Sequence, residues 1–389
     1  MFAHIPAFFK HVTARSIGIV FAVQGLLFGT WAALIPFVKH KFGLDEAQLG
    51  LLLLSLQGGV LLMNPFSVPI LHRFGAPTAA LGSLVAAAAF FSLPMLATNI
   101  WFLATALFFA GAGFASVNVA INTCATLLEA RDRVGIMSTC HALWSTGAMA
   151  GSALAGTATG LGVMPAIWSG GVALFAMVIA WLMRKPLLPL EKSDQHERGA
   201  QSGQKFAWPS AGLWLIIFLS LCTNVTEGTM ADWSAVYMRE VVMSEEFAVG
   251  WGFAAYAFCM AAGRFVGDAL IARFGAARML RVGGAVAAAG LFLLAFLPQM
   301  PFALVWFAFV GAGVSLGAPV LYAAAARAPA MAQGAGLATM NTFAMVGFFG
   351  GPVLIGFLAK IWNLPVAFAV VGATALWWAW KAGKINRKM

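Results

Sequence analysis

Apolar runs long enough to cross a lipid bilayer follow one another along almost the whole chain, separated by short polar or glycine-rich breaks. A transmembrane helix needs roughly 20 such residues, whereas strands of a membrane barrel alternate apolar and polar residues. The runs show no such alternation, so they predict an all-α membrane protein of twelve transmembrane helices. The expected helices span residues 16–38, 46–71, 77–97, 101–128, 134–160, 164–183, 209–238, 247–272, 278–298, 301–326, 332–359 and 364–381.

Composition agrees with a lipid environment. Hydrophobic residues make up 61% of the 389 residues and charged residues only 9%, with a mean hydropathy of +0.88. So few charges cannot cover a surface that faces water. In lipid, the backbone amides must instead be satisfied within the helices.

The formal charge of +10 could suggest a nucleic-acid partner, but the basic residues lie singly in the short breaks, so we expect none. With the N-terminus in the cytoplasm, most Lys and Arg fall on the cytoplasmic side, as the positive-inside rule requires. Lys39, Lys41, Arg239 and Lys360 fall on the other side. The sequence therefore predicts a multi-pass protein of the cell inner membrane with both termini cytoplasmic.

A hydrophilic stretch from Lys185 to Lys205 divides the helices into six and six. Its low hydrophobicity and mixed charge are typical of a flexible linker. We expect an N-terminal six-helix bundle in 1–184, a cytoplasmic linker in 185–208 and a C-terminal six-helix bundle in 209–389.

The two halves repeat one another. Arg73-Phe74-Gly75-Ala76 recurs as Arg273-Phe274-Gly275-Ala276, and Gly50 is matched by Gly250. Because each half holds an even number of helices, the two repeats run parallel through the membrane. At the start of the second helix, Asp45 followed three residues later by Gln48 predicts a capping box.

The six-plus-six layout and the paired basic loops resemble the major facilitator superfamily over essentially the whole chain. The best local match is Gly263-Arg264-Phe265-Val266-Gly267-Asp268, followed by Arg273-Phe274-Gly275 and Arg278. It is similar to the superfamily's acidic and basic loop motif, whereas the first-half copy around Arg73 has no acid. Segments 141–147, 227–233 and 315–319 resemble the MosC/YbjJ-type subgroup. The resemblance implies solute transport by alternating access.

Ionisable residues inside the apolar runs are the first candidates for function, because a charge at the centre of a membrane helix costs roughly 2.5–3.5 kcal/mol. Glu227 in the seventh helix, Asp232 nearer its outer end and His141 in the fifth are the expected proton-coupling residues. Each has a structural alternative: an acid that locks its helix to a neighbour, or a histidine that hydrogen-bonds between helices.

Amide and aromatic side chains inside the runs are the expected substrate contacts. Asn118 and Asn122 are four residues apart and so share a helix face, where they could bind a polar solute or hold two helices together. The expected substrate-binding set is Asn118, Asn122, Asn341, Gln24, Trp31, Gln57, Tyr256 and Tyr322.

The match to the loop motif makes charged residues at the inner helix ends candidates for a gate. Arg264 and Asp268 are four apart on the eighth helix, and basic residues follow them. Positive-inside topology alone would also explain these basic residues. The expected gating set is Arg264, Asp268, Arg273, Arg278, Arg73, Glu129 and Arg131.

These patterns favour a secondary active transporter that moves a small polar solute, sugar-like or cyclitol-like by family analogy, in symport with protons. Efflux of an amphipathic drug or siderophore-like compound is the alternative within transport, and a non-transporting receptor or a channel is the alternative outside it. No enzyme, metal or cofactor is expected, because Asp, His and Cys form no catalytic or metal-ligand spacing and no nucleotide-binding motif occurs. The expected partners are the solute, protons and membrane lipid, and the expected state is a monomer.

Overall fold

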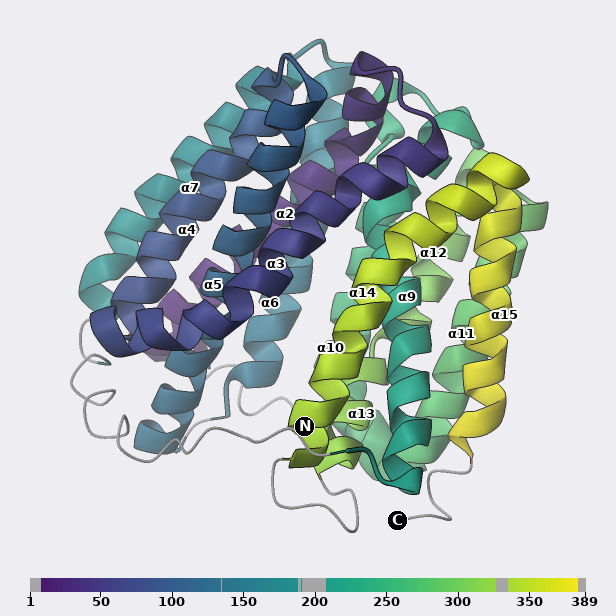
Figure 1. Cartoon of the computed structure of the whole chain (residues 1–389). Coiled ribbons are helices and arrows are strands. Elements are labelled where there is room, and N and C mark those ends of the chain that lie inside the picture. The colour runs from purple at the N-terminus through teal and green to yellow at the C-terminus, as the bar shows by residue number, and fades with distance from the viewer. Residues whose placement is uncertain (1–7, 134, 188–189, 191–207, 327–334, 384–389) are drawn as a thin grey trace. The chain divides into compact units, whose positions relative to one another are not determined.

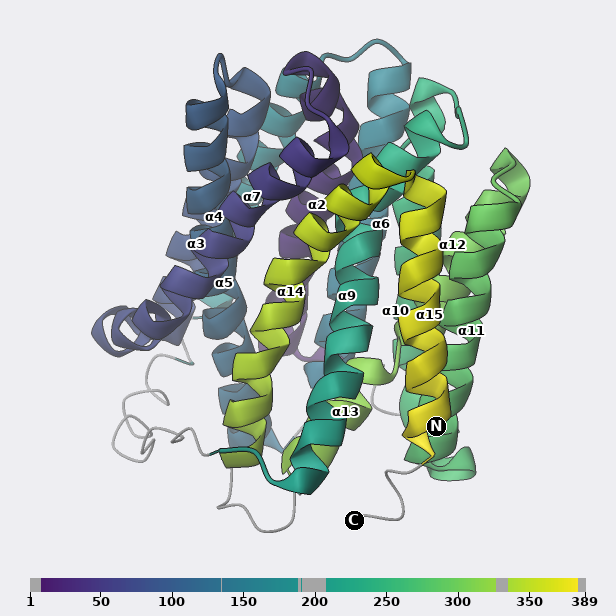
Figure 2. The ribbon, with the colours of Figure 1, turned by 45° about the vertical axis from the view of Figure 1, so that its right-hand side comes forward.

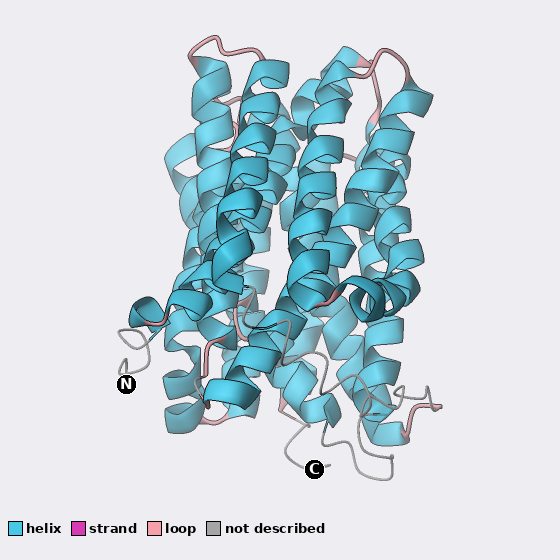
Figure 3. Cartoon of the chain, turned by 90° about the vertical axis from the view of Figure 1, so that its left-hand side faces the viewer, coloured by secondary structure: helices cyan, strands magenta, loops and turns pink. Residues whose placement is uncertain are grey.

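A computed structural model describes residues 8–133, 135–187, 190, 208–326 and 335–383. Within these ranges the chain forms helices and no strand (Figure 3). Ten of the described helices are long and apolar enough to cross a membrane. Helix α6, Met137–Gly160, is not among the ten, because Ser, Thr and Gly dilute its apolar residues.

The first repeat forms six helices (Figure 1). Their bounds are α2 Val12–Lys41, α3 Glu46–Phe74, α4 Ala76–Ser92, α5 Ile100–Asp132, α6 Met137–Gly160 and α7 Pro165–Leu187, with a short 3-10 helix, Leu93–Leu96, after α4. Helix α2 packs along α6 and also contacts α7, and α4 packs against both α5 and α7. Apart from the start of α3, these helices belong to a compact unit built from Met1–Leu44, Leu52–Gln201 and Glu245–Ala254, which we call unit 1.

The second repeat supplies most of unit 2, which comprises Asp45–Leu51, Ser202–Ser244 and Ala255–Met389. Its helices are α9 Ala211–Glu240, α10 Trp251–Phe274, α11 Ala276–Phe296, α12 Met300–Val314, α13 Gly317–Ala326, α14 Ala335–Ile361 and α15 Leu364–Ala382, with a 3-10 helix, Glu246–Ala248, before α10. Helix α9 packs against α14 and α15, and α11 packs against α12 and α15 (Figure 2).

The tenth expected span, residues 301–326, is confirmed as one apolar segment of membrane length, Met300–Ala326, but its helix is interrupted at Ser315 and Leu316. Helix α12 ends at Val314 and α13 begins at Gly317. Pro319 explains the break, because proline lacks the N–H that would bond to the carbonyl of Ser315 and its ring clashes with that carbonyl. At the same place the Ser315 hydroxyl donates a 2.8 Å hydrogen bond to the carbonyl of Ala312.

The repeated basic loops adopt the same turn in both halves, which supports the internal duplication. Gly75 has φ 81° and Gly275 has φ 82°, a left-handed conformation that favours glycine. The guanidinium of Arg73 lies 5.4 Å from the ring centre of Phe74, and that of Arg273 lies 5.2 Å from the ring centre of Phe274. The matching backbone and side-chain geometry shows that the repeat extends to local structure.

The capping box predicted at the start of α3 is confirmed. The backbone N–H of Gln48 donates to Asp45 Oδ1 at 2.8 Å, and the N–H of Asp45 donates to Gln48 Oε1 at 3.0 Å. Lys360, at the end of α14, places its ammonium 2.9 Å from Asp45 Oδ2. The hydrogen bond from Gln48 and then the Lys360 ammonium lower the pKa of Asp45 below its ordinary value.

Candidate functional site

An ion pair between Glu227 and Arg264 lies inside unit 2. Glu227 is in the middle of α9, Arg264 is in α10, and their nearest charged atoms, Oε2 and Nη2, are 4.0 Å apart. The two side chains are 20% and 13% exposed, so both are largely buried. The second carboxylate oxygen of Glu227, Oε1, has no hydrogen-bond partner among the described residues.

The attraction between the two charges is large compared with a typical side-chain hydrogen bond. Two unit charges 4 Å apart attract by about 4 kcal/mol at an effective dielectric constant of about 20. Among the Lys and Arg of the described helices, Arg264 lies farthest from any helix end. The spacing in the sequence pairs Arg264 with Asp268, whose side chain lies outside the described part of the chain. The structure places Arg264 beside Glu227.

Two tyrosines belong to the same cluster. Tyr256 lies on α10 before Arg264 and is only 2% exposed, whereas Tyr322 on α13 is 39% exposed. Both lie close enough to Glu227 to experience its charge. Tyr256 and Tyr322 thus lie within electrostatic range of Glu227, and the groups come from three helices of unit 2.

Asp232 occupies a separate place on α9. It is 6% exposed, and its Oδ2 has no hydrogen-bond partner among the described residues. Five residues separate it from Glu227, so on a helix the two acids point in different directions. Asp232 is buried, and no Lys or Arg in the described part of the chain forms an ion pair with it, so its role in proton coupling stays a prediction.

The polar residues predicted in the first repeat fall within unit 1 and make mostly local contacts. Asn122 donates to Asn118 Oδ1 at 2.7 Å, which confirms that the two share a face of α5. His141 on α6 packs edge-on against the ring of Phe21, with ring centres 5.3 Å apart. The side chain of Asn341, its counterpart in the second repeat, lies outside the described part of the chain.

An aromatic cluster in unit 1 was not predicted from the sequence. The ring of Phe28 lies 5.5 Å from that of Phe114 and 5.7 Å from that of Trp144. Gln24, one turn before Phe28, is 1% exposed and donates to the Phe114 carbonyl at 3.1 Å. The spacing of Gln24 and Phe28 on one helix face was the available signal.

The remaining predicted substrate contacts are unevenly exposed. Trp31 is 3% exposed, and its ring N–H has no partner among the described residues. Gln57 is half-buried on α3. Both residues belong to unit 1, and their substrate role stays a prediction.

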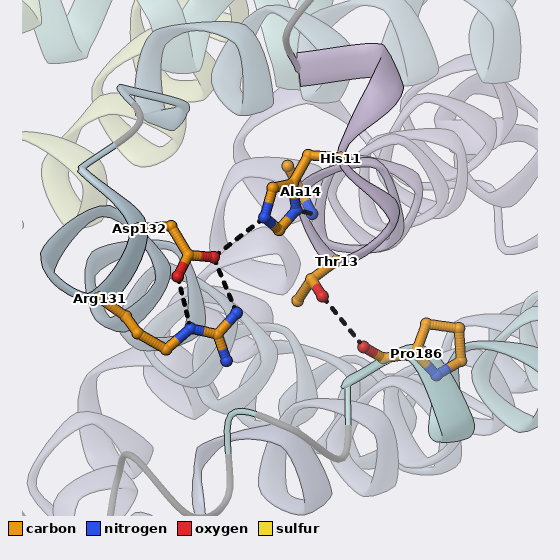
Figure 4. Close-up of polar contacts among 6 residues, drawn as sticks. All are labelled: His11, Thr13, Ala14, Arg131, Asp132 and Pro186. Atoms are coloured by element: carbon orange, nitrogen blue, oxygen red, sulfur yellow. Dashed lines mark hydrogen bonds and ion pairs between the residues drawn. The ribbon is translucent and has the colours of Figure 1, made fainter.

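Two of the predicted gating residues of the first repeat, Glu129 and Arg131, form hydrogen bonds at the end of α5, and those of Glu129 reach the start of α6. Glu129 Oε1 accepts hydrogen bonds from the backbone N–H groups of Ile136 and Met137 at 2.6 and 2.8 Å, at the start of α6. Arg131 forms two 2.8 Å hydrogen bonds with Asp132, which also contacts His11 Nε2 at 2.9 Å (Figure 4).

The basic members of the set at the other helix ends are exposed. Arg73, Arg273 and Arg278 lie at the surface where α3 and α10 end and α11 begins. No group of three His, Cys, Asp or Glu that could hold a metal ion occurs among the described residues. The exposed positions of Arg73, Arg273 and Arg278 do not test a gating role, which stays a prediction.

Comparison with known proteins extends the resemblance over the whole chain. The sequence profile of the Major Facilitator Superfamily matches residues 17–244 and 229–383. An MFS-type transporter of Yersinia pestis is 30% identical over 387 residues, 98% of this chain and 97% of the relative. A transporter of Sinorhizobium fredii, y4wD, is 30% identical over 367 residues, covering 93% and 95%, and the membrane protein MosC of Rhizobium meliloti is 27% identical over 367 residues, covering 94% and 88%.

The fold has a counterpart among solved structures. A mutant of the nucleoside transporter NupG matches with a TM-score of 0.74 over 96% of this chain and 99% of its own, at 10% sequence identity. The two parallel six-helix repeats, the family profile and the transporter relatives identify a multi-pass membrane transporter and not an enzyme. The chain belongs to the major facilitator superfamily.

Proposed function

We propose that this protein is a secondary active transporter that carries a small polar solute across the cell inner membrane by alternating access, in symport with protons. Glu227 is the proton carrier. Both termini face the cytoplasm, because this orientation places most Lys and Arg on the cytoplasmic side. The central linker, 185–208, then connects an N-terminal bundle to a C-terminal bundle on that side.

The Glu227–Arg264 pair is the observation that carries the proposal. Charged side chains in the middle of membrane helices are expensive, so they are rare where they serve only packing. The proposal requires that water, and hence protons, can reach the carboxylate, and the 20% exposure of the Glu227 side chain supports this. A carboxylate that can exchange a proton inside the membrane is the minimum that proton coupling requires.

Alternating access explains how such a group could couple the two fluxes. When the carboxylate faces the side of lower pH it takes up a proton, and when it faces the other side it releases that proton. Neutralising Glu227 weakens an attraction of about 4 kcal/mol with Arg264, so the proton changes the energy of the cluster substantially. The solute must therefore interact differently with the two states of the cluster.

The polar character of the cluster supports a polar solute over an amphipathic one. Tyr322 presents an exposed phenol near Glu227, and Tyr256 lies deeper beside it. Hydroxyl and charged groups of this kind recognise hydroxyl-bearing molecules, for which a sugar-like or cyclitol-like size is suitable. NupG is named a nucleoside transporter, but at 10% identity it shares the fold and not a demonstrated specificity.

Transport by purified protein in liposomes tests the proposal. Sugars, cyclitols, nucleosides and organic acids should be screened for uptake driven by an inward proton gradient, with and without a protonophore. Glu227→Gln should abolish accumulation while retaining solute exchange at equal concentrations, because binding survives and only proton coupling is lost. Glu245→Gln, an exposed acid in the loop before α10, is the control and should behave as the unmodified protein. Accumulation by Glu227→Gln equal to that of the control would exclude Glu227 as the carrier.

A further inference from the structure

We propose that the transported solute carries one acidic group, which binds beside Arg264 when Glu227 takes up its proton. The inference rests on the proton coupling proposed above and specifies the class of solute. The solute would contain a carboxylate or a similar anion and several polar groups, as a small hydroxy acid or a sugar acid does.

The charge of the cluster leads to this class. Glu227 and Arg264 carry opposite charges 4.0 Å apart. Protonation of Glu227 adds one positive charge to the cluster, whatever else contacts Arg264. Inside the membrane an added charge is costly, and an acidic group of the solute would compensate it. An ionised Glu227 would repel the same acidic group, so proton and acid each strengthen the binding of the other.

The geometry of the pair agrees with this role. Charge-assisted hydrogen bonds are about 2.7–2.9 Å long, so the 4.0 Å between Nη2 and Oε2 is too long for one. A guanidinium presents five N–H donors in one plane, a shape that matches a carboxylate. The Glu227 oxygen without a hydrogen-bond partner shows that the pair has not closed tightly on itself.

The choice of arginine also favours an anion. A neutral solute could be recognised by amides and hydroxyls, which cost less to place inside a membrane than a guanidinium. Arg264 is the Lys or Arg farthest from a helix end among the described helices. The exposed phenol of Tyr322, near Glu227, could donate a further hydrogen bond to the solute.

Matched pairs of acid and neutral probes test the inference by binding. Gluconate with glucose and lactate with glycerol should be titrated into purified protein between about pH 5.5 and 8, where both acids stay ionised. Binding of at least one acid should tighten by up to tenfold for each unit of pH decrease, with uptake of about one proton per site, while its neutral partner binds weakly and independently of pH. In Glu227→Gln the acid should bind at every pH without proton uptake. Arg264→Gln should lose the preference for the acid, Arg264→Lys should retain part of it, and Glu245→Gln should match the unmodified protein.

Transport gives a second and independent readout. One proton moving with a monovalent anion carries no net charge, so uptake of the acid probe into liposomes should follow the pH gradient and ignore a membrane potential set with valinomycin. Uptake of a neutral probe with a proton, driven by that potential, would overturn the inference and leave the proposed function intact. Failure of all four probes to bind, or acid binding without proton uptake, would also overturn it. Loss of proton coupling for every solute would instead refute the proposed function.

Discussion

Two glycines at matching places of the repeat lie at helix crossings that leave no room for a side chain. A Cβ atom on Gly50 of α3 would lie 2.7 Å from the carbonyl oxygen of Pro352 in α14. A Cβ atom on Gly250, just before α10, would meet the carbonyl oxygen of Ser152 in α6, whose hydroxyl donates a 2.7 Å hydrogen bond to the Gly250 carbonyl. We predict that Gly50→Val and Gly250→Val force these crossings apart.

The magnitude follows from what blocks the new side chain. The obstacle is backbone in both cases, so it cannot be relieved by a rotamer change, and overpacking of this kind costs about 1–3 kcal/mol. Asp45–Leu51 belongs to unit 2 although the rest of α3 belongs to unit 1, and Glu245–Ala254 belongs to unit 1 although the rest of α10 belongs to unit 2. Each substitution should therefore favour a conformation in which its crossing is open, by about 5- to 150-fold at about 1.4 kcal/mol per tenfold.

Cysteine labelling can measure this shift. A single cysteine at Val353, which faces Gly50 across the crossing, should be introduced after the native cysteines are replaced by serine. Its rate of reaction with a membrane-impermeant maleimide should rise severalfold or more in Gly50→Val. Gly170→Val is the matched control, because a Cβ atom there would meet nothing within 4 Å. Equal labelling rates in the single-cysteine protein, its Gly50→Val variant and its Gly170→Val variant would refute the reasoning. A higher rate in Gly170→Val would assign the effect to the loss of glycine flexibility instead of the crossing.

Three further substitutions test local structure. The pKa of Asp45 is lowered in the folded protein, so its interactions stabilise the fold above its ordinary pKa and are lost as pH falls through the lowered value. Lys360→Ala removes one of these interactions. The difference in melting temperature between Lys360→Ala and the unmodified protein should therefore shrink towards zero on acidification. Glu129→Gln should lower the melting temperature, because a charged acceptor at the start of α6 is lost, at a cost of about 1 kcal/mol. Pro319→Ala should allow α12 and α13 to join, which would be seen as slower amide hydrogen exchange around Ser315, whereas unchanged exchange would show that proline does not cause the break.

The helices and their repeat could be predicted because both depend on local sequence. Apolar run length defines a membrane helix, and a left-handed turn needs glycine, so Gly75 and Gly275 marked the same loop in both halves. The Asp45 and Gln48 capping box was likewise readable from spacing alone. The break at Ser315 was readable in principle from Pro319, but the uninterrupted apolar composition around it concealed the break.

The site could be predicted only in part, because it depends on how helices are rotated against one another. The cost of a charge in lipid marked Glu227 and the loop motif marked Arg264, but their contact depends on how α9 and α10 are placed, which no spacing within one helix records. The i, i+4 rule directed attention from Arg264 to Asp268 instead. The same rule worked for Asn118 and Asn122, because their contact lies within a single helix.

The repeat is unequal in chemistry where it is equal in architecture. At the offset that aligns Gly29-Thr30 with Gly228-Thr229, the place of Glu227 is taken by Phe28, the centre of the aromatic cluster in unit 1. At the offset of the basic loops, the place of Arg264 is taken by Asn64. The two repeats thus share a scaffold, but at the positions that correspond to Glu227 and Arg264 the first repeat has an aromatic and an amide side chain. Under the proposed mechanism only the second repeat responds to protons, and a change of charge in that half is enough to alter the balance between conformations that both halves share.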